Sequence, residues 1–186
     1  TRVEPVSDPF TEALAPRAIS LGGPAVGNLS TFTISARMQG RSVLTDTDLT
    51  RRILDCPSGA AGFTAEVTAR GGDVTACDIS YSDGIEKIAA NAVSEVERGN
   101  AYVRQHPDLY CWSHFTDPDD HLHQRTRGAQ LFADHSGREL QRYVTGALPQ
   151  LPFADADFDL VLCSHLLFSY PNELDYPFHL DAIIEL

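Results

Sequence analysis

The chain has 186 residues, 42% of them hydrophobic, and a formal net charge of −12 at pH 7. This length and composition predict one globular domain with a real core rather than a disordered chain. An acidic surface repels phosphate groups, so nucleic acid and anionic membranes are disfavoured as partners. The sequence lacks an apolar run of the roughly 18 residues that a membrane-spanning helix needs, so we expect none.

The cysteines indicate a reducing compartment. Three of the four lie in or beside apolar runs, which is typical of small buried side chains and not of a disulfide framework. They are Cys56, Cys77, Cys111 and Cys163. The start of the chain shows no signal-peptide pattern. We therefore predict a cytoplasmic protein.

Helix and strand patterns become clear only after residue 50. Residues 1–50 are rich in glycine and proline and predict an irregular N-terminal cap or lead-in segment. Residues 51–186 predict a single Rossmann-like domain, in which 100–137 are a candidate helical cover. Strands are expected within 51–56, 73–78, 143–145 and 158–165, and helices within 62–71, 82–105, 116–135 and 173–186.

The alternation of strands and helices predicts the fold class. It indicates an α/β domain with an open, mostly parallel sheet and helices on both faces. Asp117 before Pro118 is typical of a helix start. In the last helix, Leu180, Ile183 and Ile184 are expected to face inward. Only about four strands are found, so the sheet is interpreted as truncated at its C-terminal end.

One strand-to-helix turn carries the main chemical signal. It reads "DCPSGAAG", residues 55–62, and Asp78 ends the next strand 19 residues after Gly59. Gly59 and Gly62 let the backbone approach a ligand closely, and the amides at the helix start offer donors. A carboxylate at Asp78 can accept hydrogen bonds from ribose hydroxyls. A plain tight turn with a surface aspartate remains the alternative.

These segments resemble class I S-adenosylmethionine-dependent methyltransferases. The resemblance rests on "ILDCPSGAAGFTAEVTARGGDVTACDIS" and "LPQLPFADADFDLVLCSHLLFSY" and covers roughly residues 51–170. Pro57 and Ala61 replace glycines of the family's first motif. Pro57 also offers no amide donor where a dinucleotide motif has its first glycine, which disfavours a nicotinamide cofactor.

The resemblance implies a set of site residues and a cofactor, S-adenosylmethionine, which leaves as S-adenosylhomocysteine. Residues of the turn would hold the methionine part, Asp78 the ribose and Ile79 the adenine, with Leu148 and Ser164 near the cofactor. The implied cofactor-binding set is Asp55, Pro57, Ser58, Gly59, Gly62, Asp78, Ile79, Leu148 and Ser164. His165 and Tyr170 are the candidate substrate-binding residues.

His165 is also the candidate general base, since it follows a buried strand and has an ordinary pKa near neutrality. The alternatives are that His165 only shapes the acceptor pocket and that Tyr170 only packs. Transfer of the methyl group needs mainly alignment of the nucleophile, the methyl and the sulfur. A base is needed only where the acceptor must lose a proton early.

Two further groups of polar side chains are interpreted as structural. A zinc site would need Cys111, His114, His121 and His123, but a helix start divides them, so we predict no metal. The acidic run at Asp155, Asp157 and Asp159 is interpreted as a solvated turn into the fourth strand.

Three functions therefore stay open. The first is a methyltransferase acting on a small molecule, the second a non-catalytic nucleoside-cofactor binding protein, and the third a nicotinamide-dependent oxidoreductase. The acceptor and the oligomeric state do not follow from the sequence.

Overall fold

The computed structural model describes residues 37–38, 41–42, 44–110, 112, 115–164, 166–167, 170 and 173–186. Near its start, β1 (Arg37–Met38) pairs antiparallel with β2 (Arg41–Ser42). The sequence predicted irregular structure there. Each strand has two residues, which is too few for an alternating pattern to indicate a strand.

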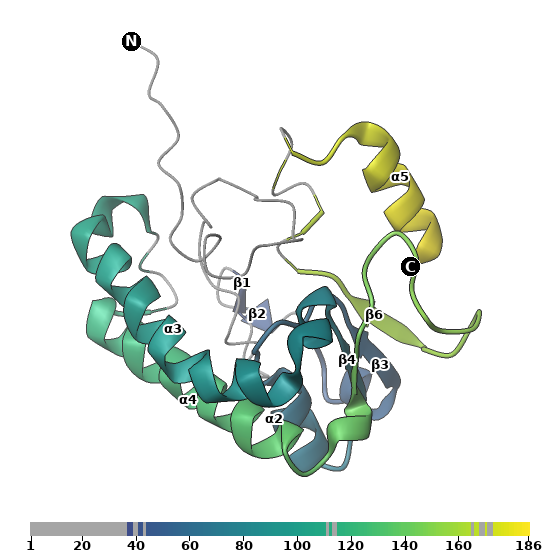
Figure 1. Cartoon of the computed structure of the whole chain (residues 1–186), viewed down its shortest axis with the longest axis horizontal. Coiled ribbons are helices and arrows are strands. Elements are labelled where there is room, and N and C mark those ends of the chain that lie inside the picture. The colour runs from purple at the N-terminus through teal and green to yellow at the C-terminus, as the bar shows by residue number, and fades with distance from the viewer. Residues whose placement is uncertain are drawn as a thin grey trace.

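The main sheet has four strands and is open. Its strands are β3 (Arg52–Asp55), β4 (Asp73–Cys77), β5 (Tyr143–Val144) and β6 (Leu160–Leu162). They are all parallel and lie in the order β5-β4-β3-β6. This arrangement confirms the predicted α/β, Rossmann-like open sheet (Figure 1).

Four α-helices accompany this sheet in the described part of the chain. They are α2 (Phe63–Ala69), α3 (Ile85–Gln105), α4 (Pro118–Ser136) and α5 (Tyr176–Glu185). Four short 3-10 helices connect them: η1 (Asp48–Thr50), η2 (Ile79–Asp83), η3 (Pro107–Leu109) and η4 (Leu140–Arg142). Asp117 caps α4 as predicted, because its Oδ1 accepts from the N–H groups of Asp119 and Asp120. Within the described ranges, none of the helices has both the length and the apolar composition to cross a membrane.

Helices cover both faces of the sheet. Ile53 and Val74 point to the face where α2 packs, together with Phe63 and Val67. Neighbouring side chains of a strand point to opposite faces, and Leu54 packs with Ala182 of α5. The predicted covering of both faces is therefore confirmed.

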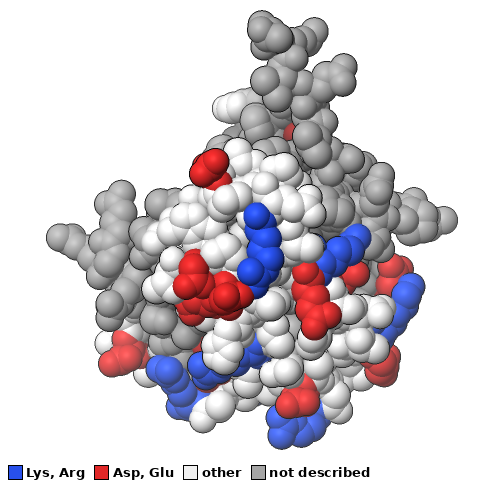
Figure 2. Space-filling model, turned by 90° about the vertical axis from the view of Figure 1, so that its left-hand side faces the viewer, with Lys and Arg blue, Asp and Glu red and all other residues white. Residues whose placement is uncertain are grey.

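The helices α3 and α4 form an antiparallel hairpin that runs past the sheet (Figure 1). One end packs on the sheet, where Ile85 and Phe132 join the core around Tyr81. At the other end Asn100 donates to the carbonyl of Pro118. Acidic and basic side chains lie close together on the described residues of this side of the molecule (Figure 2).

The orientation of α5 differs from the prediction. Leu180, Ile183 and Ile184 do not face inward: all three are exposed, Ile184 by 73%. The buried residues of α5 are His179 and Ala182. This helix is apolar on most of its surface, so its sequence period does not identify the buried face. The small side chain of Ala182 lets the helix approach the sheet closely.

Candidate functional site

The site forms where the strand order reverses. The chain runs from β3 to β4 and β5 on one side, then crosses to β6 on the other side of β3. In open α/β sheets, ligands bind at the carboxyl ends of strands at such a switch point. Asp55 ends β3, and Asp78 follows β4 directly. We call residues 55–62 and 78–81 the carboxyl edge.

Asp78, the predicted ribose-binding residue, holds the glycine turn in place. Its carboxylate is buried and accepts three hydrogen bonds. Oδ2 accepts from the Gly59 N–H at 2.8 Å, and Oδ1 accepts from the N–H and the hydroxyl of Ser80 at 2.9 and 2.7 Å. The 19-residue spacing in the sequence thus corresponds to a direct contact.

Gly59 is held at both of its backbone polar groups. Its φ of +54° lies in the left-handed region that favours glycine. While Asp78 accepts from its N–H, the Tyr81 hydroxyl donates to its carbonyl at 2.6 Å. Tyr81 is itself packed between the rings of Phe132 and Tyr143. The loop is therefore fixed before any ligand binds.

Three amides of the loop have no hydrogen-bond acceptor among the described residues. Pro57 has no N–H, and the Ser58 N–H donates to the carbonyl of Cys77. The N–H groups of Ala60, Ala61 and Gly62 donate to none of the described residues. Because α2 has only seven residues, we base the site on these donors and not on a helix dipole.

Gly62 has a packing role as well. A Cβ at this position would lie 3.1 Å from the Cα of Gly128 and 3.3 Å from the Cβ of Leu131. The end of the loop therefore packs directly on the backbone of α4. This contact positions the hairpin of α3 and α4 against the carboxyl edge.

Asp55 is a second carboxylate at this edge, and it has no cationic partner among the described residues. It is 4% exposed, and its Oδ2 accepts from the Ser58 hydroxyl at 2.9 Å. Burial raises the pKa of Asp55 to about 7; the Ser58 hydrogen bond opposes this rise, and the nearby Asp78 charge adds to it. Asp55 thus changes charge near neutral pH.

The other predicted cofactor residues lie at different depths. Ile79 is 52% exposed beside Asp78, so an apolar surface is open there. Leu148 is buried and packs with Leu54 and Cys77 in the core on the α5 face. Ser164 follows β6 and is half-buried.

The structure describes one of the two predicted substrate-binding residues, Tyr170. The Tyr170 carbonyl accepts from the N–H groups of Glu173 and Leu174, so Tyr170 begins a turn that leads toward α5. His165 lies outside the described residues.

The cysteines near this edge belong to the core. Cys56 and Cys77 are buried free thiols, and Cys163 is a half-buried one. A hydrogen bond with Cys77, together with burial, raises the pKa of the Cys56 thiol. Burial likewise raises the pKa of the Cys163 thiol. Thiols of raised pKa are poor nucleophiles, so we assign Cys56 and Cys163 no reaction. The same hydrogen bond between Cys56 and Cys77 lowers the pKa of the Cys77 thiol, which is fully buried in the core.

The opposite ends of the strands carry paired charges. Arg52 donates to both carboxylate oxygens of Asp159, and its Nη2 lies 2.8 Å from Oδ1. This lowers the pKa of Asp159 to about 2. Arg142 pairs with Asp73 at 2.8 Å. We call Arg52, Asp73, Arg142 and Asp159 the amino edge.

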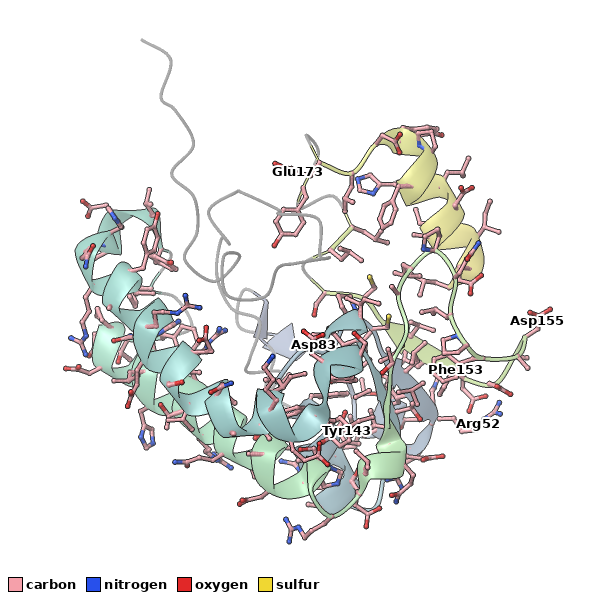
Figure 3. The ribbon with its side chains drawn as sticks, in the orientation of Figure 1. Arg52, Asp83, Tyr143, Phe153, Asp155 and Glu173 are labelled. Atoms are coloured by element: carbon pink, nitrogen blue, oxygen red, sulfur yellow. The ribbon has the colours of Figure 1, made fainter. Side chains whose placement is uncertain are left out.

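A hollow of about 360 Å³ borders the amino edge. Its lining includes Arg52, Asp73 and Phe153. In Figure 3, Arg52 and Phe153 lie beside each other at this side of the sheet, and Asp155 lies farther out. The hollow is separate from the predicted cofactor residues, so cavity size does not identify the candidate site.

The candidate zinc ligands do not come together in the described part of the chain. His121 is buried, with Nδ1 3.1 Å from the Asn100 side-chain nitrogen, whereas His123 is exposed. Burial lowers the pKa of His121 to about 4. Cys111 and His114 lie outside the described residues. Those residues that are described include no group of metal-ligating side chains.

Three residues of this region were missed by sequence reasoning. Ser80 fixes Asp78, and its signal was present, because an Asp-x-Ser spacing is typical of a local side-chain turn. Tyr81 supports Gly59, and Arg125 of α4 is half-buried with its Nε and Nη1 atoms covered. Neither has a local sequence signal, because each depends on contacts between distant segments.

Comparison with known proteins adds one relative. No family model matches the chain, and no solved structure matches it. The chain is similar to the uncharacterized protein MJ0045 of Methanocaldococcus jannaschii, with 29% identity over 139 residues. The match covers 74% of this chain and 63% of the relative, and the relative's name carries no activity. The function is therefore argued from the site.

Proposed function

We propose that this chain is a cytoplasmic methyltransferase that uses S-adenosylmethionine to methylate a small-molecule acceptor. The observation that carries the proposal is the hydrogen bond from the Gly59 N–H to Asp78 at the switch point of the sheet. It joins a glycine turn to a carboxylate at the end of the neighbouring strand, as a nucleoside site requires. Free buried thiols at Cys56 and Cys77 suit a reducing compartment.

The ribose would bind at Asp78. A carboxylate oxygen can accept about two hydrogen bonds, and among the described residues Oδ2 accepts only one, from Gly59. Oδ2 thus keeps acceptor capacity for one ribose hydroxyl. A second hydroxyl at Oδ1 would have to displace the Ser80 hydroxyl, which can rotate away. The exposed Ile79 offers an apolar surface for the adenine.

The reacting end would lie near Asp55 and the loop amides. When bound, S-adenosylmethionine supplies an electrophilic methyl group on a positively charged sulfur. Asp55 lies beneath the loop with no cation of its own, so a positive ligand would favour its charged form. The N–H groups of Ala60, Ala61 and Gly62 suit the carboxylate of the amino-acid part.

The remaining work of the chain would be alignment. Gly59 is held at its N–H and at its carbonyl, so the loop needs little ordering when the cofactor binds. His165 remains the proposed base for an acceptor that must lose a proton, and Tyr170 remains the second proposed substrate-binding residue. The adjacent acidic side chains would stay acceptors of hydrogen bonds, not nucleophiles.

Two other functions make different predictions. A non-catalytic binding protein would bind the cofactor without turnover. A nicotinamide-dependent oxidoreductase would bind NAD, but Pro57 removes one of the amides expected to contact a pyrophosphate. The cofactor that binds therefore separates the oxidoreductase from the other two functions. Turnover separates the methyltransferase from the non-catalytic binding protein.

The first experiment is calorimetry of the full chain with S-adenosylhomocysteine and with NAD. We expect micromolar binding of S-adenosylhomocysteine and no binding of NAD. Asp78→Ala should weaken binding by about 1–3 kcal/mol, the range of a charge-assisted hydrogen bond. Asp83→Ala is the matched control, because Asp83 is an exposed carboxylate five residues further along.

Because Asp78 also fastens Gly59, unfolding of every variant must be measured alongside binding. A folded protein that binds NAD and not S-adenosylhomocysteine would overturn the proposal. Equal losses of S-adenosylhomocysteine affinity in Asp78→Ala and Asp83→Ala would show that Asp78 does not contact the ligand.

A further inference from the structure

Arg125 on α4 is half-buried, and part of its guanidinium has no hydrogen-bond partner among the described residues. Its Nε and Nη1 are both buried, and neither forms a hydrogen bond in the described part of the chain. Burial lowers the pKa of Arg125 to about 10, and the nearby Tyr110 opposes this effect. The guanidinium therefore stays charged at neutral pH. Burying an unpaired charge costs stability, so the position calls for an explanation.

Other arginines of the same hairpin and its neighbours are paired. Arg104 pairs with Asp119, and Arg127 approaches Glu66 at 4.0 Å. Arg142 pairs with Asp73. In a chain of net charge −12, carboxylates are abundant, yet none of the described ones pairs with Arg125. No described carboxylate therefore competes for the unused donors of this guanidinium, which are the basis for an anion site.

The position of Arg125 along α4 relates it to the candidate site. At its C-terminal end α4 leads to Arg142 at the amino edge, and Gly128 touches Gly62 at the carboxyl edge. Arg125 precedes Gly128 by three residues, or about 4.5 Å of helix rise, so it lies beyond the carboxyl edge.

The expected direction of the Arg125 side chain bears on which ligand it can contact. Long side chains on a helix point back toward its N-terminus, so the Arg125 guanidinium is expected to extend away from the loop. The loop amides at Ala60, Ala61 and Gly62 already suit the carboxylate of the cofactor. With the cofactor bound to the loop as proposed above, the Arg125 guanidinium would be left for a second ligand, which in that function is the acceptor.

We propose that Arg125 binds a carboxylate or phosphate group of the methyl acceptor, and that the acceptor is therefore an anionic small molecule. This inference rests on the proposed methyltransferase function, because only that function has a methyl acceptor. The planar guanidinium matches two oxygens of such a group in a bidentate contact. An acidic protein repels anions in general, so a dedicated cation is needed to hold one.

The test uses inorganic phosphate as the probe, with thermal unfolding of the full chain at constant ionic strength as the readout. Phosphate that binds the folded state raises the midpoint in a saturable way. We expect Arg125→Met to weaken phosphate binding about tenfold or more, since a charge-assisted contact is lost. Arg125→Lys should fall between Arg125→Met and the unchanged chain. Arg127→Met is the control, because Arg127 lies two residues away and is exposed.

Arg125→Met is expected to fold and to be at least as stable as the unchanged chain without phosphate, because an uncompensated charge is removed. If Arg125→Met unfolds, Arg125→Lys still tests the site, because it keeps the charge and loses the bidentate geometry. Equal phosphate binding in Arg125→Met, or in Arg125→Lys where only that variant folds, would overturn the proposal.

A second arm repeats the titration with saturating S-adenosylhomocysteine. Unchanged phosphate affinity means that the two ligands bind side by side, as proposed. Competition between them would place Arg125 on the cofactor's own carboxylate and overturn the acceptor assignment. If S-adenosylhomocysteine does not bind at all, the proposed function fails, but the titration without it still decides whether Arg125 is an anion site.

Discussion

The two edges of the sheet both carry charged side chains, but these side chains have different partners. At the amino edge, Arg52 pairs with Asp159 and Arg142 with Asp73, and most of these side chains are well exposed. At the carboxyl edge, Asp55 and Asp78 are buried and accept hydrogen bonds only from neutral donors. Paired, exposed charges are typical of structure, whereas buried carboxylates without cations are typical of sites that await a ligand.

The comparison also shows why cavity volume is a poor guide here. The hollow of about 360 Å³ borders the amino edge, where the charges are already satisfied. At the carboxyl edge, in contrast, three loop amides donate to none of the described residues, and neither carboxylate has a described cationic partner. A ligand site is better identified by polar groups that lack hydrogen-bond partners and are held at fixed positions.

The largest effect is expected for Asp55→Asn at alkaline pH. The pKa of Asp55 rises from 3.8 in the unfolded chain to about 7 in the folded one. Its protonated form therefore supports folding below pH 4, and this contribution is lost as the pH rises through 7. Asn stays neutral, so the variant should gain about 4 kcal/mol of unfolding free energy over the unchanged chain at pH 8 and little at pH 4.

Chemical denaturation between pH 4 and 8 checks this, with Asp83→Asn as a control for removing an exposed carboxylate. His121 acts in the opposite direction, because its pKa is lowered to about 4. Its contribution is present above pH 6.5 and is lost as the pH falls through 4. The unchanged chain should thus show a flat pH profile, and Asp55→Asn a rising one. A constant difference between the two chains would show that Asp55 does not titrate as a buried group.

The next effect concerns the contact between the loop and α4. Gly62→Ala would place a methyl group 3.1 Å from the backbone of Gly128, which the two segments can relieve only by moving apart. Overpacking of this kind costs about 1–3 kcal/mol. We expect a lower unfolding midpoint and weaker binding of S-adenosylhomocysteine. In Gly137→Ala the new methyl would meet the Ala133 carbonyl at an ordinary 3.6 Å, so this control should change neither quantity.

A smaller effect is expected for Tyr81→Phe. This change removes the hydroxyl that donates to the Gly59 carbonyl and keeps the ring packed against Phe132 and Tyr143. Loss of one such hydrogen bond costs about 0.5–1.5 kcal/mol of unfolding free energy. Cofactor binding should weaken by a comparable factor, because the loop must then be ordered by the ligand. Tyr143→Phe, which loses a contact with His135 away from the loop, should affect stability and not binding.

The sequence predicted the parts of this molecule that depend on local pattern. The four parallel strands, the cap at Asp117 and the pairing of the Gly59 turn with Asp78 follow from short-range signals. Hydrophobic period, proline and glycine positions, and a fixed spacing sufficed for these. The nature of the Gly59–Asp78 contact was still unexpected, because the sequence assigned Asp78 to a ribose, whereas in the structure its carboxylate binds the loop itself.

The parts that were missed depend on contacts between distant segments. The buried face of α5 was assigned to Leu180, Ile183 and Ile184, whereas the helix packs through Ala182. An apolar helix has no period from which its inner face can be inferred. The burial of Arg125 depends on where the hairpin crosses the loop, and an arginine in a helix carries no signal of that.

The smallest effect should come from the amino edge, and its size is the sharpest check on the comparison. Arg52 lowers the pKa of Asp159 to about 2, so this contribution is present above pH 4 and is lost as the pH falls through 2. Both side chains are about half exposed, and such pairs are screened by salt. Asp159→Asn should therefore shift the unfolding midpoint slightly at low salt and not at 1 M salt, where the Debye length is about 3 Å. Asp55→Asn should keep its effect in the same salt, because Asp55 is buried. If salt erased both effects equally, the carboxyl edge would be as open to solvent as the amino edge, and the distinction drawn between a structural edge and a ligand-binding one would fail.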